Sequence, residues 1–329
     1  MARRMTQVLV TVDTELSALL HQRGLSARAN LDSSISGSCA VGSFGIGWQM
    51  DQLEARGLKG VFFVDPMPGL LYGEAIIADI VAPIIARGHE VQLHIHTEWL
   101  EWVADSPVEG RQGHDLADFS FEDQVILLGR ATAMIERAGA PRPTAFRAGN
   151  YGANDDSLRA LAALGLIWDS SVNAPYLGGA CRISAAPDAI GAYRMEGVIE
   201  LPVAGLFDQG QSVRPAQICA LSSAEMKAAL THAAREDHGA FVIVTHSFEM
   251  LSRDRSRPNR AVMRRFEAMC DVIAANPGLH SAGFADLDPT QLLARSGQHR
   301  LGPDRWRTQR RMVEQMLATL RYERRLRPV

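Results

Sequence analysis

Acidic, imidazole and guanidinium side chains follow several apolar runs of this sequence, at the points where those runs end. Asp13 and Glu15 come after one run, His94 and His96 close another, and a long apolar run leads directly into His246. Carboxylate and imidazole groups gathered in one place can bind a divalent cation or transfer protons during hydrolysis. These positions therefore predict a site for metal-assisted or acid–base chemistry.

The first of these segments reads Thr-Val-Asp-Thr-Glu, ending at Glu15. Side chains alternate across a strand, so Asp13 and Glu15 are expected on one face and Thr14 on the other. Two carboxylates side by side repel unless a cation or a proton lies between them. The other interpretation is a pair of solvated loop acids.

The second segment places His94 and His96 on one strand face, with apolar residues on the opposite face. A lone histidine is more often a residue of the core, but two imidazoles on one face favour a divalent-metal site. Glu98 continues that face and would lie four residues from His94 if the chain turns helical. It is a third candidate ligand.

Arg147 and His246 end two further candidate strands. Arg147 precedes the small and polar residues 149–152, and it could pair with Asp13 and keep it charged. Taken singly, these residues are equally well explained as a surface ion pair and a capping histidine. The site is indicated because all six polar residues fall at ends of predicted strands.

The elements that must position these residues alternate between short β-rich runs and longer helical patterns, which predicts a mostly parallel sheet. Seven or eight such units favour a distorted (β/α) barrel, in which catalytic residues lie at the carboxyl ends of the strands. Residues 26–47 and 173–195 interrupt the alternation and are expected to be loops. The predicted strands are Val8–Val12, Gly60–Asp65, Glu90–His96, Thr144–Ala148, Ile167–Ser171, Val198–Pro202, Ala240–His246 and Ser281–Phe284.

The C-terminal part of the chain is basic, with ten arginines against five acidic residues over 285–329. We expect a barrel over 1–296 and a helical extension over 297–329. The apolar residues of the extension recur near the helical period and are expected to dock on the barrel, with the arginines facing outward. An anionic partner or surface is the alternative role for them. The apolar set is Trp306, Val313, Met316, Leu317 and Leu320, and the outward arginines include Arg307, Arg311 and Arg325.

Composition excludes several classes of function. The net charge of −3 argues against nucleic-acid binding by bulk charge, and no run of 18 apolar residues predicts a membrane span. The N-terminus lacks the long apolar core of a secretory signal. The four cysteines are too widely spaced for a CxxC metal site and too few for a disulfide scaffold. We therefore expect a cytoplasmic protein; the oligomeric state is not predicted.

Together these segments resemble the polysaccharide deacetylase family, which has the NodB-homology fold. The resemblance runs from about Val8 to Asp286, and its strongest part is similar to the Gln-Leu-His-x-His-x-x-Trp pattern of the WalW-like branch. The matching segments are Thr11–Glu15, Gly88–Trp99, Phe146–Gly152, Asp169–Val172 and Val244–His246.

The resemblance implies a bacterial hydrolase that binds one divalent metal and removes acetyl groups from an N-acetylated sugar or polysaccharide precursor. It implies that Asp13 is the general base, oriented by Arg147, and that His246 is the general acid. Zinc is the expected ion, with cobalt or nickel as alternatives. Trp99, Asn150 and Tyr151 are the expected sugar contacts.

Two positions depart from the family pattern. Thr14 stands where the family has a second acid, and Glu98 stands at the usual spacing of the second histidine. Side-chain alternation instead favours Glu15, His94 and His96 as the ligands, with Asp13 as the base or a fourth ligand. The alternatives are a non-catalytic carbohydrate-binding protein of the same fold and an amidohydrolase acting on a small cyclic amide or ureide.

Overall fold

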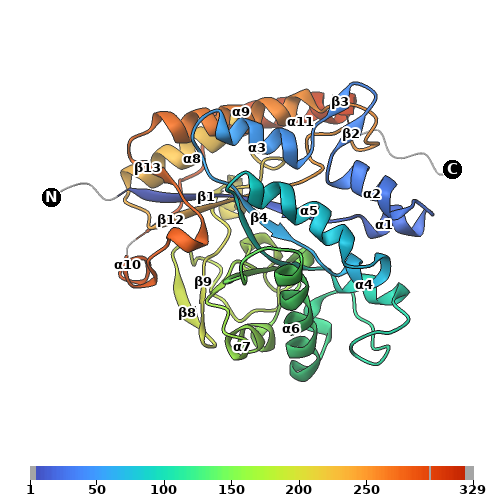
Figure 1. Cartoon of the computed structure of the whole chain (residues 1–329). Helices are drawn as coiled ribbons and strands as arrows, with labels where there is room; N and C mark the ends of the chain where they lie inside the picture. Colours follow the sequence, from blue (N-terminus) through green and yellow to red (C-terminus); the bar gives the residue numbers. More distant parts are fainter. Residues whose placement is uncertain (1–4, 296–297, 323–329) are drawn as a thin grey trace.

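A computed structural model describes residues 5–295 and 298–322, and within them a nine-stranded sheet forms the centre of the molecule (Figure 1). Eight strands follow one another in the order β12, β1, β4, β5, β6, β7, β9 and β8, and β13 pairs with the first half of β1. The strands are β1 (Thr6–Thr14), β4 (Val61–Val64), β5 (Glu90–Ile95), β6 (Ala145–Ala148), β7 (Trp168–Asp169), β8 (Tyr193–Met195), β9 (Val198–Glu200), β12 (Ala240–His246) and β13 (Leu279–Ser281).

The sheet is parallel except for β8, which pairs antiparallel to β9. Between β9 and β12 the barrel is joined by isolated parallel bridges, from Val203 to Val242 and from Gln217 to Val244. Because this side has no continuous ladder, the barrel is distorted. The distorted (β/α) barrel predicted from the sequence is confirmed.

Helices cover the outside of the sheet (Figure 1). None of the helices within the described part of the chain is long and apolar enough to cross a lipid bilayer. The helices are α1 (Ala18–Gln22), α2 (Ala27–Ser34), α3 (Ile46–Glu54), α4 (Pro68–Tyr72), α5 (Ala75–Ala86), α6 (Phe121–Arg137), α7 (Asp155–Ala163), α8 (Ser223–Arg235), α9 (Arg260–Ala275), α10 (Pro289–Leu293) and α11 (Arg305–Tyr322).

The interior of the barrel changes from apolar to polar along each strand. Leu9 of β1, Phe63 of β4 and Val242 of β12 belong to one buried apolar cluster. Two and four residues beyond Leu9, on the same face of β1, lie Thr11 and Asp13. The amino half of the barrel is therefore closed by apolar packing, and polar side chains gather at the carboxyl ends.

The long loop predicted over residues 26–47 is wrong. Residues Ala27–Ser34 form α2, whose first turn is capped by the Ser26 hydroxyl accepting from the Ala29 N–H. A short antiparallel hairpin, β2 (Ser38–Cys39) and β3 (Gly42–Ser43), follows it. The sequence of α2 is mostly polar, so it has no clear apolar stripe by which periodicity could have revealed it.

The predicted docking face of the C-terminal helix is also wrong. The five apolar residues expected to pack on the barrel are between 53% and 81% exposed, whereas Arg311 is buried. Its guanidinium donates to Asp208 at 2.9 Å and to Glu225 at 3.0 Å. The helix therefore docks through a buried ion-pair network. Arg325 lies outside the described residues, and the division of the chain at 296 stays a prediction.

Arg311→Ala is expected to lower the free energy of unfolding by about 3–5 kcal/mol, because it leaves the buried Glu225 carboxylate without its cation, whereas Asp208 keeps Arg214. Arg310→Ala is the matched control on the same helix. Arg310 is exposed and pairs with Glu314 at 3.4 Å, so its loss should cost less than about 1 kcal/mol. Urea unfolding followed by circular dichroism measures both. Equal stability of the two variants would contradict this account of how α11 docks.

Candidate metal centre and proton-transfer groups

Three neighbouring strands deliver Glu15, Asp65 and His94 to one level of the barrel. Thr14 of β1 pairs with Val64 of β4, and Val64 pairs with the residue before His94 on β5. The Asp65 N–H continues this ladder by donating to the Thr14 carbonyl at 3.1 Å. Residues at one register of a parallel sheet point to the same side. The next residue of each strand therefore points into the barrel mouth.

The three predicted metal ligands lie together. Oε2 of Glu15 is 3.1 Å from Nε2 of His94 and 2.6 Å from Nε2 of His96. One donor atom from each of these residues lies within 4.8 Å of the other two. A carboxylate and two imidazoles at this spacing are a donor set that suits Zn²⁺ and similar ions.

The tautomer of His94 is set by the backbone of β6. Its Nδ1 donates to the carbonyl oxygen of Arg147 at 2.7 Å. In the neutral imidazole this leaves a lone pair on Nε2, which faces the Glu15 carboxylate. Two acceptors at 3.1 Å are stable only with a proton or a cation between them. The arrangement fits a bound metal ion.

The electrostatics of the cluster are those of a buried ion pair. Burial opposes ionisation of Glu15, but the two imidazoles outweigh it and hold the pKa of Glu15 well below its usual range. Burial likewise lowers the pKa of His96, yet the Glu15 carboxylate raises it to about 10. The Glu15 carboxylate is therefore stabilised by positive charge on the imidazoles. A divalent cation bound by the three residues would provide the same stabilisation.

The two departures from the family pattern are explained by side-chain direction. Thr14 is buried, and its hydroxyl donates to the Val12 carbonyl at 3.0 Å, on the face away from the cluster. Glu98 lies on the far side of the His96 ring, 4.0 Å from Nδ1 and 3.6 Å from His114. Neither residue belongs to the donor group.

Arg147 holds Asp13 in place. Its Nη1 donates to Asp13 at 2.6 Å, and both side chains are buried. The same guanidinium donates to the Thr11 hydroxyl at 2.8 Å and to the Ser170 carbonyl at 3.2 Å, and it lies 4.4 Å over the ring of Phe63. These contacts fix the position of the Arg147 guanidinium. Its hydrogen bond therefore also fixes the orientation of the Asp13 carboxylate.

His246 lies opposite Asp13 in the pairing of β1 with β12. Its Nδ1 is 3.0 Å from a Glu249 carboxylate oxygen, and the Thr245 hydroxyl donates to the other oxygen at 2.8 Å. Burial lowers the pKa of His246, but the Glu249 carboxylate outweighs it and raises the pKa to about 9. The imidazole is therefore protonated at neutral pH and can act as a proton donor.

Asp65 is a site residue that the sequence analysis did not identify. Its Oδ1 accepts from the Met67 N–H at 2.9 Å, while Oδ2 is buried without a hydrogen-bond partner among the described residues. Burial raises the pKa of Asp65 to about 6, against the opposing effect of His96 and His94. Its position, an acid closing a buried strand, is the same signal that identified Asp13.

The expected sugar contacts are not all at the surface. Trp99 is completely buried and packs edge-on against Tyr72 and Trp102, so in this structure its indole belongs to the core. Tyr151 is also buried, and its hydroxyl accepts from Gln217 at 2.9 Å. Asn150 is exposed. Of these three side chains, only that of Asn150 is open to a ligand in this conformation.

No protein-family model matches the sequence, and no curated protein matches it significantly. Solved structures do resemble the fold. A protein from Mycobacterium smegmatis assigned as a polysaccharide deacetylase is 18% identical, with a TM-score of 0.58 over 91% of this chain and 93% of its own. The 4-alpha-glucanotransferase from Thermococcus litoralis is 10% identical, with a TM-score of 0.51 over 91% of this chain and 41% of that enzyme.

The chain therefore has the polysaccharide deacetylase fold, as the sequence resemblance implied. Because a glucanotransferase shares that fold, the fold by itself does not decide the reaction. The reaction has to be argued from the site. The WalW-like branch stays a prediction.

Proposed function

We propose that this protein is a metal-dependent hydrolase that removes acetyl groups from an N-acetylated sugar or glycan precursor. The observation that carries the proposal is the cluster of Glu15, His94 and His96 at the barrel mouth, with Asp13 and His246 beside it. A ligand set, a candidate base and a candidate acid at one place are what amide hydrolysis requires.

The three donors suit Zn²⁺, Co²⁺ or Ni²⁺ better than Mg²⁺ or Ca²⁺, because imidazole ligands favour the transition ions. Asp65, whose Oδ2 is without a partner among the described residues, follows the neighbouring strand at the same register but lies outside this donor group. A divalent ion bound by Glu15, His94 and His96 would supply Lewis-acid chemistry, lowering the pKa of a bound water from 15.7 toward about 7 and polarising the amide carbonyl.

The residues of the chain handle the protons. Asp13, oriented by Arg147, accepts a proton from the attacking water as its oxygen bonds to the acetyl carbon. The C–N bond then breaks, and His246 gives its proton to the departing amine. The products are acetate and a free amino sugar. Glu249 keeps His246 protonated for this step.

The pH dependence of the reaction is expected to follow His246. Its pKa is raised to about 9, so the acid form is present at neutral pH and is lost as the pH rises through 9. Acetate release should fall above that pH. Glu249→Gln removes the carboxylate that contributes most to raising the pKa of His246. The fall in acetate release at high pH should therefore move toward the ordinary histidine pKa of about 6.5. Asp13 and Glu15, which also raise this pKa, remain in the variant. If acetate release by Glu249→Gln fell at the same pH as in the wild type, a group other than His246 would cause the fall.

The direct test is acetate release from N-acetylglucosamine oligomers and peptidoglycan fragments by protein loaded with Zn²⁺, compared with protein treated with a chelator. The proposal expects release that depends on metal. Turnover of hydantoin-like cyclic amides without acetate release would instead identify an amidohydrolase. Sugar binding without any turnover in the loaded protein would identify a non-catalytic carbohydrate-binding protein.

A further inference from the structure

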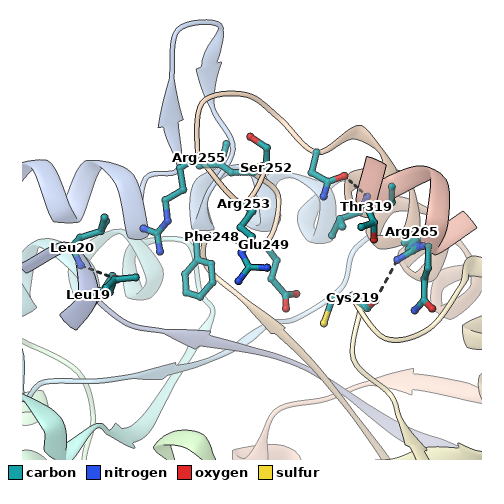
Figure 2. Close-up of a pocket in the computed structure, with 16 residues that line it drawn as sticks. Leu19, Leu20, Cys219, Phe248, Glu249, Ser252, Arg253, Arg255, Arg265 and Thr319 are labelled. Atoms are coloured by element: carbon teal, nitrogen blue, oxygen red, sulfur yellow. Dashed lines mark hydrogen bonds between the residues drawn. The ribbon is translucent and has the colours of Figure 1, made fainter. Parts of the chain in front are cut away.

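A half-open cavity of about 610 Å³ lies beside His246 and is lined by α1, the loop that follows β12, α9 and the inner side of α11 (Figure 2). Its volume is in the range of small-molecule sites. Phe248 and Glu249 form part of its wall, and Glu249 is the partner of His246. The cavity therefore adjoins the Nδ1 side of His246, where Glu249 is bound.

The cavity contains an arginine that lacks an acidic partner. Arg255 lines it, and no carboxylate among residues 5–295 and 298–322 forms an ion pair with its guanidinium. Nη1 donates to the hydroxyls of Ser34 at 2.6 Å and Ser33 at 3.2 Å. Burial lowers the pKa of Arg255 to about 10, against the raising effect of Glu15. A half-buried guanidinium bonded only to hydroxyls is stabilised further by an anion.

The surroundings hold Arg255 in a defined position. Its guanidinium stacks over the ring of Phe248 at 4.7 Å, and Figure 2 shows its side chain extending from the loop toward Leu20. Its backbone has φ of +56°, a left-handed conformation that a non-glycine residue keeps only where its surroundings enforce it. The Arg255 N–H donates to the Ser252 carbonyl at 2.7 Å and closes this turn.

The ring of Phe248 lies between Arg255 and His246. The ring of Phe248 is 5.4 Å from the ring of His246 on one side and carries Arg255 on the other. His246 would face the departing amine during hydrolysis. Arg255 is therefore separated from His246, the proposed proton donor, by the single ring of Phe248.

We propose that this cavity is a subsite for an oxyanion, the carboxylate or phosphate of an acidic N-acetylated sugar, with Arg255 as the residue that selects it. The proposal rests on the deacetylase function for the identity of the sugar, but the anion site stands on its own contacts. Guanidinium groups bind carboxylate and phosphate with two parallel hydrogen bonds, which a neutral hydroxymethyl group cannot match. Arg253, which also lines the cavity, adds positive charge at the edge.

Calorimetric binding of three probes tests the subsite: N-acetylglucosamine, its 6-phosphate and an N-acetylated aminouronic acid. The wild-type protein is expected to bind at least one acidic probe about tenfold or more tightly than the neutral sugar. Arg255→Gln should remove that preference and leave binding of the neutral sugar unchanged. Whichever acidic probe is preferred identifies phosphate or carboxylate as the anion. Equal binding of all three probes by the wild type would overturn the proposal.

Arg257→Gln is the matched control on the same loop. Arg257 is exposed and does not line the cavity; its guanidinium bonds the Arg321 carbonyl and faces Tyr322. This variant should keep the full preference for the acidic probe, and loss of preference in it would point to long-range charge and overturn the subsite. If Arg255→Gln does not fold, Arg255→Lys keeps the charge and should weaken binding of the acidic probe only partly. Unchanged binding of the acidic probe by a folded Arg255→Lys protein would also overturn the subsite.

Binding and turnover separate this proposal from the deacetylase function. Arg255-dependent binding of an acidic probe in a protein that releases no acetate from any substrate would retain the subsite and remove the deacetylase function. Metal-dependent acetate release with no difference between acidic and neutral sugars would retain the deacetylase function and remove the subsite.

Discussion

A protein in which both His94 and His96 are replaced by alanine is expected to bind no divalent cation at concentrations that saturate the wild type. The change removes two of the three donors and leaves Glu15 alone with a buried negative charge. Loss of even one outer partner of a metal ligand usually costs about 10–100-fold in affinity, so loss of two ligands should exceed that range. Equilibrium dialysis with elemental analysis measures the stoichiometry, and the expected change is from about one ion per chain to none.

Glu98→Gln is the matched control for this experiment. Glu98 lies next to His96 but outside the donor group, so the variant should retain the metal. Circular dichroism has to show that the double alanine variant is folded. Unchanged stoichiometry in the double variant, or loss of metal in Glu98→Gln, would mean that the ion is bound elsewhere.

Asp13→Asn is expected to keep the metal and lose at least about a hundredfold in acetate release, the usual scale for removing a general base. Asparagine has nearly the same shape and can still accept the hydrogen bond from Arg147, but it cannot take a proton from water. The change also leaves the buried Arg147 without its counter-charge, which can cost about 3–5 kcal/mol of stability. Rates should therefore be measured well below the unfolding temperature.

Glu15→Gln is the counterpart on the same strand face. It should lose metal and activity together, because the carboxylate contacts both imidazoles. If Asp13→Asn lost the metal while Glu15→Gln kept it, the two residues would have exchanged roles. Full acetate release by Asp13→Asn would exclude Asp13 as the base.

The first strand shows what the sequence alone was able to determine. Alternation along β1 predicted that Asp13 and Glu15 share a face and that Thr14 points away, and Thr14 does bond the Val12 carbonyl on the opposite side. Seven of the eight predicted strands are present, whereas the predicted strand Ser281–Phe284 shares only Ser281 with β13, because Phe284–Asp286 form a 3-10 helix. Both results depend on local backbone geometry, which a short segment specifies wherever its apolar pattern is clear. Parallel strands then bring their carboxyl ends together without further information.

The docking of α11 and the roles of Asp65 and Trp99 depended on the tertiary structure. Helical periodicity shows which residues share a face, but not which face has a partner. Asp208 and Glu225, about a hundred residues earlier in the chain, selected the face carrying Arg311. The burial of Trp99 and the partnerless oxygen of Asp65 likewise depend on neighbours from other strands and helices. Such contacts between distant segments leave no period or spacing in a single sequence, so only the folded chain determines them.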